Sequence, residues 1–184
     1  FCFFQATTLG VNLKLAKGGQ IYWYMQITSK TEDFVTTKRY DGKPFTQKGH
    51  ISKTHMRDLT VQLLTPYQIG CDLEQVTIKE DDHWLALLGQ ERYNLATYVS
   101  RSCKEELSVS ATRIWGIAES LKKADLHLME TILFNQQKSS QLHYYKCGNH
   151  TVLSLSFIAK EANVESVFTT VLVNEFNPVD HEEV

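Results

Sequence analysis

Proline, cysteine and long apolar runs are scarce in this chain of 184 residues, which has three prolines and four cysteines. No tract rich in Ser, Gly or Pro marks a linker. No apolar run approaches the roughly 20 residues that a helix needs to cross a bilayer. Hydrophobic residues make up 42% and charged residues 22%, as in ordinary globular domains. The sequence therefore predicts a single domain over residues 1–184 without a membrane span.

The motifs of the commonest enzyme classes are also missing. No glycine-rich loop ends in Gly-Lys-Ser or Gly-Lys-Thr, and no Gly-x-Gly-x-x-Gly joins a strand to a helix. The Gly-x-Ser-x-Gly elbow of hydrolases and the His-Glu-x-x-His of metalloproteases do not occur either. We therefore expect a protein that is not an enzyme and that uses no cofactor.

The cysteines give a weak indication of the compartment. They lie at positions Cys2, Cys71, Cys103 and Cys147, without the tight spacing of a disulfide framework. A domain of this length folds without disulfides, which favours an intracellular protein of the nucleus or cytoplasm. A secreted recognition domain with two disulfides is the alternative, because Asn149-His150-Thr151 is a glycosylation sequence in a predicted turn.

Apolar and polar residues alternate through the last third of the chain. The alternating runs cover residues 126–134, 141–146, 151–158 and 164–176. Successive side chains of a strand point to opposite faces, so this alternation predicts strands with one buried face. We expect a four-strand antiparallel meander over residues 125–176. Its last strand has few charges between Val167 and Asn174 and is predicted to form the exposed edge.

Patterns typical of strands also occur earlier in the chain. Residues 11–15 and 21–28 alternate on either side of Gly18-Gly19, which is the pattern of a β-hairpin. A third β-rich run covers residues 34–40. Three shorter runs, over residues 76–78, 83–88 and 93–99, predict further strands. Gly89 directly follows the second of these runs.

Two segments have the period of a helix. Met56, Leu59 and Leu63 are spaced for one face of a helix over residues 51–64, which Pro66 would end. The clearer apolar stripe belongs to a helix over residues 108–124; its members are Ile114, Ile117, Ala118, Leu121 and Ala124.

This order of elements predicts an α+β fold, with about ten strands in a mostly antiparallel sheet and two helices. Residues 1–65 and 66–124 have similar lengths, which suggests an internal pseudo-repeat before the meander. The helices would cover one face of a curved sheet, or line one side of a clamp-like domain as in DNA sliding clamps. The comparison with clamps rests on element order alone.

The leading hypothesis for function is a non-catalytic protein-protein interaction or scaffold module, acting as a complex subunit or a homo-oligomer. Sheet edges bind partners through backbone groups, and exposed tyrosines are common anchors at protein interfaces. The predicted contact residues are Tyr22, Tyr24, Tyr144, Tyr145, Val167, Thr169 and Val171.

Nucleic-acid contact is an alternative of a different class. The net charge of −2 gives no overall attraction to nucleic acid. Basic residues nevertheless outnumber acids between Lys38 and Arg57, and more lie on the second predicted helix, so together they would neutralise phosphates. The residues of this alternative are Lys38, Arg39, Lys43, Lys48, Lys53, Arg57, Arg113, Lys122 and Lys123.

His143, Cys147 and His150 are the nearest approach to a metal site. Zinc takes four protein ligands in a structural site, or three and a water in a catalytic one. No fourth ligand is evident near these residues, so we expect no metal there.

Overall fold

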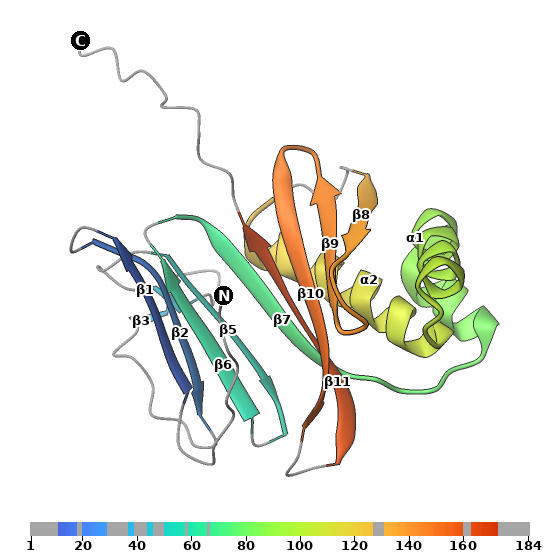
Figure 1. Ribbon diagram of the computed structural model, residues 1–184, viewed down its shortest axis with the longest axis horizontal. Helices are drawn as coiled ribbons and strands as arrows, with labels where there is room; N and C mark the ends of the chain where they lie inside the picture. Colours follow the sequence, from blue (N-terminus) through green and yellow to red (C-terminus); the bar gives the residue numbers. More distant parts are fainter. Residues whose placement is uncertain are drawn as a thin grey trace.

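A computed structural model gives the fold (Figure 1). It describes the backbone of residues 11–17, 20–28, 37–38, 44–45, 50–57, 59–65, 67–126, 131–159 and 163–172, and the side chains from residue 50 to residue 171 within these ranges. The fold is α+β with two helices and antiparallel sheets, as predicted. Among the described residues, no helix combines the length and apolarity needed to span a membrane.

The first sheet has four strands in the order β1-β2-β6-β5. Their bounds are Val11–Lys17 for β1, Gln20–Thr28 for β2, His50–Met56 for β5 and Leu59–Thr65 for β6. β1 and β2 pair antiparallel, which confirms the predicted hairpin. The short strands β3 (Thr37–Lys38) and β4 (Pro44–Phe45) pair with each other. The rest of the predicted run at 34–40 lies outside the described residues.

The second sheet has five strands in the order β7-β11-β10-β9-β8. Their bounds are Ile69–Gln75 for β7, Ile132–Gln137 for β8, Leu142–Cys147 for β9, His150–Ala159 for β10 and Val164–Leu172 for β11. The predicted meander is confirmed, although its first strand begins at Ile132 and not at residue 126. The prediction of about ten strands in one sheet is not matched, because the described residues form nine strands in the two larger sheets, with the short pair β3-β4 apart from them.

Both helices lie on the same side of the second sheet (Figure 1). α2 (Leu107–Lys123) confirms the predicted helix at 108–124 and packs along β7 and β11. α1 (Asp81–Cys103) packs on α2 and reaches β8. The helices therefore leave the opposite face of the sheet to other elements.

The helix predicted at 51–64 is wrong, because this segment forms the antiparallel pair β5-β6. Arg57 turns the chain with a φ of 52°. The helical spacing was misleading because Leu59, Val61 and Leu63 also alternate as a strand. In β5 the buried residues include Ser52 and Thr54, so apolar alternation did not mark that strand.

The strands predicted at 83–88 and 93–99 are also wrong, because both runs belong to α1. Trp84 and Leu88 lie one helical turn apart and are buried, as are Ala96 and Val99. Gly89 interrupts the helix with a φ of 73°, a conformation that glycine adopts at little cost. Short apolar runs on either side of this glycine therefore resembled two strands. The structure assigns no strand to residues 76–78.

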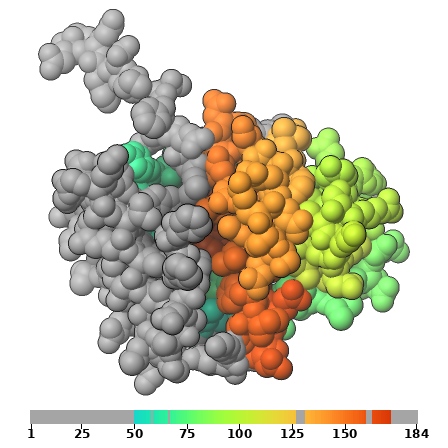
Figure 2. Space-filling view, viewed as in Figure 1, coloured from blue at the N-terminus to red at the C-terminus, as the bar shows by residue number. Residues whose placement is uncertain are grey.

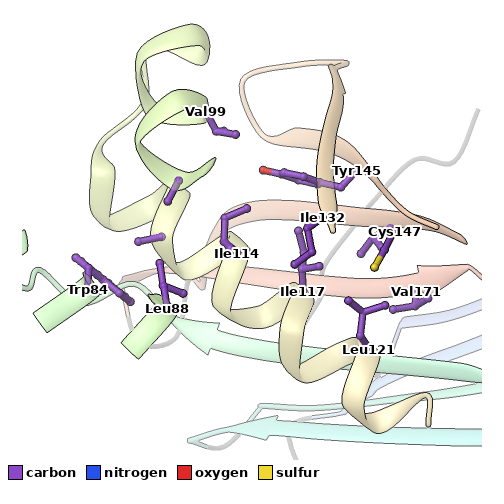
Figure 3. Packing of buried hydrophobic residues seen from close by; sticks show 13 residues of the cluster. Trp84, Leu88, Val99, Ile114, Ile117, Leu121, Ile132, Tyr145, Cys147 and Val171 are labelled. Atoms are coloured by element: carbon purple, nitrogen blue, oxygen red, sulfur yellow. The ribbon is translucent and has the colours of Figure 1, made fainter. Parts of the chain in front are cut away.

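The main core lies between α2 and the helix-facing side of the second sheet (Figure 3). Ile114, Ile117 and Leu121 are at most 1% exposed, as their helical stripe predicts. They face side chains that alternate along the strands: Ile132, Tyr145, Cys147, Val152 and Val171. Burial of these apolar groups fixes α2 on the sheet.

The first sheet packs at the β7 end of the second sheet. Val61 and Leu63 of β6 share a smaller core with Cys71, Leu73 and Phe168. β5 meets β7 through hydroxyl groups: the backbone N–H of Cys71 donates to Ser52 Oγ at 2.9 Å, and that of Leu73 donates to Thr54 Oγ1 at 3.0 Å. Side-chain oxygens thus satisfy backbone donors of β7 that face the first sheet.

Replacing Gly70 in β7 by alanine should destabilise the fold. A Cβ atom at this position would lie 1.9 Å from the carbonyl oxygen of Ser120 in α2, so the helix or the strand has to move. We expect a loss of about 1–3 kcal/mol in the free energy of unfolding, measured by urea denaturation. Thr131→Ala, at an exposed position, is the control and should cost less than about 0.5 kcal/mol. Equal stabilities of the two variants would contradict the close packing of α2 on β7.

Candidate functional site

β8 is an outer strand of the second sheet and, in the part of the chain that the structure describes, it pairs with β9 alone. Its sequence, Ile-Leu-Phe-Asn-Gln-Gln, contains no charged residue. The pairing with β9 is irregular between Phe134 and Gln136, which marks a bulge. Charges protect many natural edge strands from pairing with other chains, and β8 lacks that protection.

Apolar side chains flank this edge on both faces of the sheet. Leu133 points away from the helices and is 59% exposed. On the helix side, the exposed ring of Tyr98 in α1 contacts Phe134 edge-on, with ring centroids 6.4 Å apart. We call Leu133, Tyr98 and the outer side of β8 the open edge. Figure 2 shows part of its surroundings, with the orange atoms of the meander beside the green atoms of α1.

Aromatic rings connect the open edge with a polar cluster in the core. Phe134 lies 5.7 Å from the His143 ring and 5.5 Å from the Tyr145 ring, measured between centroids. Both His143 and Tyr145 are fully buried on β9. Burial, with a further contribution from Arg113, lowers the pKa of His143 to about 4. The imidazole is therefore neutral at pH 7, and burial also raises the pKa of Tyr145.

Arg113 is the centre of the polar cluster and is itself fully buried. Its Nε donates to both carboxylate oxygens of Glu105 at 3.2 Å. Its terminal nitrogens donate to the carbonyl oxygen and hydroxyl of Ser154, each at 3.1 Å, and to Ser156 Oγ at 2.8 Å. The guanidinium thus joins the α1–α2 connection to β10. A buried charge is tolerated when it is paired and hydrogen-bonded in this way.

The local backbone conformation brings Glu105 into contact with Arg113. Lys104 ends α1 in the left-handed conformation, with a φ of 55°, and turns the chain so that Glu105 faces the sheet. Ser110 Oγ donates to Glu105 Oε1 at 2.7 Å. His143 Nδ1 lies 3.9 Å from the same oxygen, beyond the length of a hydrogen bond.

Sequence reasoning missed this cluster, although β10 carries a signal for it. Val152, Ser154 and Ser156 alternate and face the helices, so a buried strand face carries hydroxyls where apolar residues are usual. Such a pattern indicates a polar partner across the core. Arg113, one residue away from the apolar stripe of α2, is that partner.

A second polar contact holds the other end of α2. Lys123 Nζ lies 2.6 Å from Asp72 Oδ1 of β7, and Thr54 of β5 donates to the same oxygen at 3.4 Å. Trp115 Nε1 donates to Glu74 at 3.3 Å. Burial, and then the nearby Asp72 carboxylate, raise the pKa of Glu74. These groups tie both sheets to α2.

The prediction that the last strand forms the exposed edge is wrong. β11 lies between β7 and β10, so it is not an edge. Its residues Val167, Thr169 and Val171 are at most 1% exposed and face α2. Tyr145 is buried, and Tyr144 is half-buried on the opposite face. The side chains of Tyr22 and Tyr24 lie outside the described residues, although β2 contains both positions.

The residues of the nucleic-acid alternative do not form one basic surface where their side chains are described. Arg113, which the alternative assigns to phosphate contact, is buried and paired with Glu105. Lys123 pairs with Asp72, and Lys122 lies 3.7 Å from Glu119. Lys53 is half-buried, and exposed Arg57 donates to Gln75 at 3.0 Å. Side-chain placements at Lys38, Arg39, Lys43 and Lys48 lie outside the described residues.

The three candidate metal ligands do not converge. Cys147 and His150 lie opposite each other in the β9-β10 pair. His143 is four residues from Cys147 along β9, about 13 Å at the usual strand rise. Within the residues whose side chains are described, no group of three or more His, Cys, Asp or Glu is suited to hold a metal ion. Cys71, Cys103 and Cys147 are thiols.

Comparison with known proteins adds no functional assignment. No model of a protein family matches the sequence, and no curated protein matches it. The open edge offers backbone hydrogen-bonding groups beside exposed apolar side chains, and the polar cluster holds the helices behind it.

Replacing Arg113 by methionine should strongly destabilise the fold, because it leaves the Glu105 carboxylate, only 12% exposed, without its cation. Breaking a buried pair from one side costs about 3–5 kcal/mol. Chemical denaturation of Arg113→Met and Lys122→Met measures the difference. Lys122 lies on the same helix with its side chain 65% exposed, so its variant should lose less than about 1 kcal/mol. Similar losses would contradict a structural role for the Arg113 cluster.

His143 should make the fold less stable in acid. Its pKa is about 4 in the folded state against an ordinary value of 6.5, so below pH 6.5 the unfolded chain binds a proton that the folded chain excludes. We expect this residue to remove about 2 kcal/mol of stability between pH 7 and pH 5. Urea denaturation at both pH values should show a smaller decrease for His143→Leu than for the wild type. His83→Leu, at an exposed position, is the control. If His143→Leu loses as much stability between pH 7 and pH 5 as the wild type, this assignment is refuted.

Proposed function

We propose that this chain is a non-catalytic protein-interaction module that binds an extended segment of its partner at the open edge. The added segment would pair with β8 through backbone hydrogen bonds and extend the second sheet by one strand. The observation that carries this proposal is that β8 is an outer, uncharged strand in the described part of the chain.

Exposed apolar groups support the same surface. Leu133 and Tyr98 are 59% and 58% exposed, and a strand docked on β8 would contact one of them on each face of the sheet. Aromatic and apolar anchors of this kind supply much of the binding energy at protein interfaces. Backbone pairing gives affinity for an extended segment. The two flanking side chains select which side chains that segment has at alternate positions.

The packing behind β8 suits a rigid docking surface. Phe134 packs on His143 and Tyr145, and Arg113 fixes the helices on the strands that follow. A preorganised edge loses little conformational entropy when a partner binds. Nucleic-acid contact and a secreted recognition domain remain alternatives that no contact among the described residues favours.

Leu133→Lys tests the proposal, because it places a charge on the open edge without removing a buried group. The wild type and Leu133→Lys are immobilised, exposed to extract of the source cells, and the captured proteins are compared by quantitative mass spectrometry. Loss of one hot-spot contact weakens binding by about 2 kcal/mol or more, so the partner should fall at least about tenfold. Ile78→Lys is the matched control, since Ile78 is 94% exposed in the β7–α1 connection. A set of captured proteins that is the same for all three chains would overturn the proposal.

A further inference from the structure

We propose that the strand that pairs with β8 is the β8 strand of a second copy of this chain, an inference that rests on the proposed function of the open edge. Two copies related by a two-fold axis would place their β8 strands antiparallel and join the two five-stranded sheets into one. The charge pattern, the side-chain chemistry and the exposed apolar groups of the edge all favour this partner.

The charge pattern permits β8 to pair with itself. None of its six residues is charged, so two antiparallel copies bring no like charges together. An edge with lysine or glutamate along its length would repel its own copy. The first charge after β8 is Lys138, whose backbone N–H donates to the Leu142 carbonyl at 2.8 Å in the turn to β9. The uncharged character therefore extends along the whole strand.

The exposed side chains of β8 are self-complementary. Asn135, Gln136 and Gln137 are all exposed. Each amide carries both a donor and an acceptor, so it can hydrogen-bond to an identical group on another copy. Charged side chains need a partner of opposite sign, whereas amides pair with their own kind. A two-fold axis repeats every contact between two different positions, which doubles its contribution.

The flanking apolar groups enlarge the interface beyond the strand itself. A stable interface buries about 1,200–2,000 Å² in total, more than six paired residues provide. Leu133 on one face and Tyr98 on the other are more than half exposed in the single chain. In a pair of copies each of these side chains meets the opposing edge. The bulge at Phe134 shortens the regular pairing, so we expect a dimer that dissociates on dilution.

Sedimentation velocity over a concentration series tests this inference with four purified chains. The wild type should change from monomer to dimer as its concentration rises, and Ile78→Lys should behave in the same way. Leu133→Lys and Gln136→Lys should remain monomeric at the concentration where the wild type is mostly dimer. Circular dichroism checks that each variant keeps the wild-type fold, and the exposure of both edge positions makes misfolding unexpected.

Two results would overturn the inference: a wild type that is monomeric throughout, or a dimer that persists in both β8 variants. A monomeric wild type that still loses a captured protein in Leu133→Lys would end self-pairing and leave the proposed function standing. A monomeric wild type whose captured proteins do not depend on Leu133 would overturn both.

Discussion

The buried Arg113 guanidinium is the interaction on which the arrangement of the second sheet and its helices depends. It reaches from α2 to both serines of β10 and to Glu105 in the connection between the helices. Removing such a charge from water costs several kcal/mol unless its donors are matched. Its acceptors lie on β10 and in the connection between the helices, so a shift of α2 along the strands would separate the guanidinium from them.

This packing places the helices on one face of the sheet, with β8 as an outer strand among the described residues. α2 follows β7 and β11, and the contact between Lys123 and Asp72 holds its far end there. α1 is held beside α2 through the same Glu105 connection and touches β8 with Tyr98. The helices thus cover one face of the sheet and stop at its outer strand. The structure combines a rigid, well-packed platform with an edge that carries no protective charge.

The sequence predicted the parts of the fold that depend on local periodicity. The apolar stripe of α2 and the alternation of β9, β10 and β11 each repeat over enough residues to identify the element. The prediction failed for β5. There the buried hydroxyls of Ser52 and Thr54 accept hydrogen bonds from backbone N–H groups of β7, where the two sheets meet. It failed for α1, where Gly89 divides one helix into short runs. For β5 the deciding contact lies elsewhere in the chain, whereas in α1 the helix break at Gly89 is local.

The candidate site was less predictable for a related reason. The order of strands places β11 between β7 and β10, so the last strand of the meander is central and its first strand is the edge. Alternation reveals which face of a strand is buried and says nothing of its neighbours. The sequence predicts a surface position for Arg113, because its partners, Glu105 on one side and Ser154 on the other, meet it only after folding.

Native-state hydrogen exchange, resolved by residue, tests the central claim most directly. An edge strand on a rigid platform should have slow amide exchange in α2, β10 and β11. In dilute protein, the amides of β8 that point away from β9 should exchange much faster than those of its neighbours. Uniform protection along β8, equal to that of β10, would show that the edge is already covered within the chain and would contradict the account.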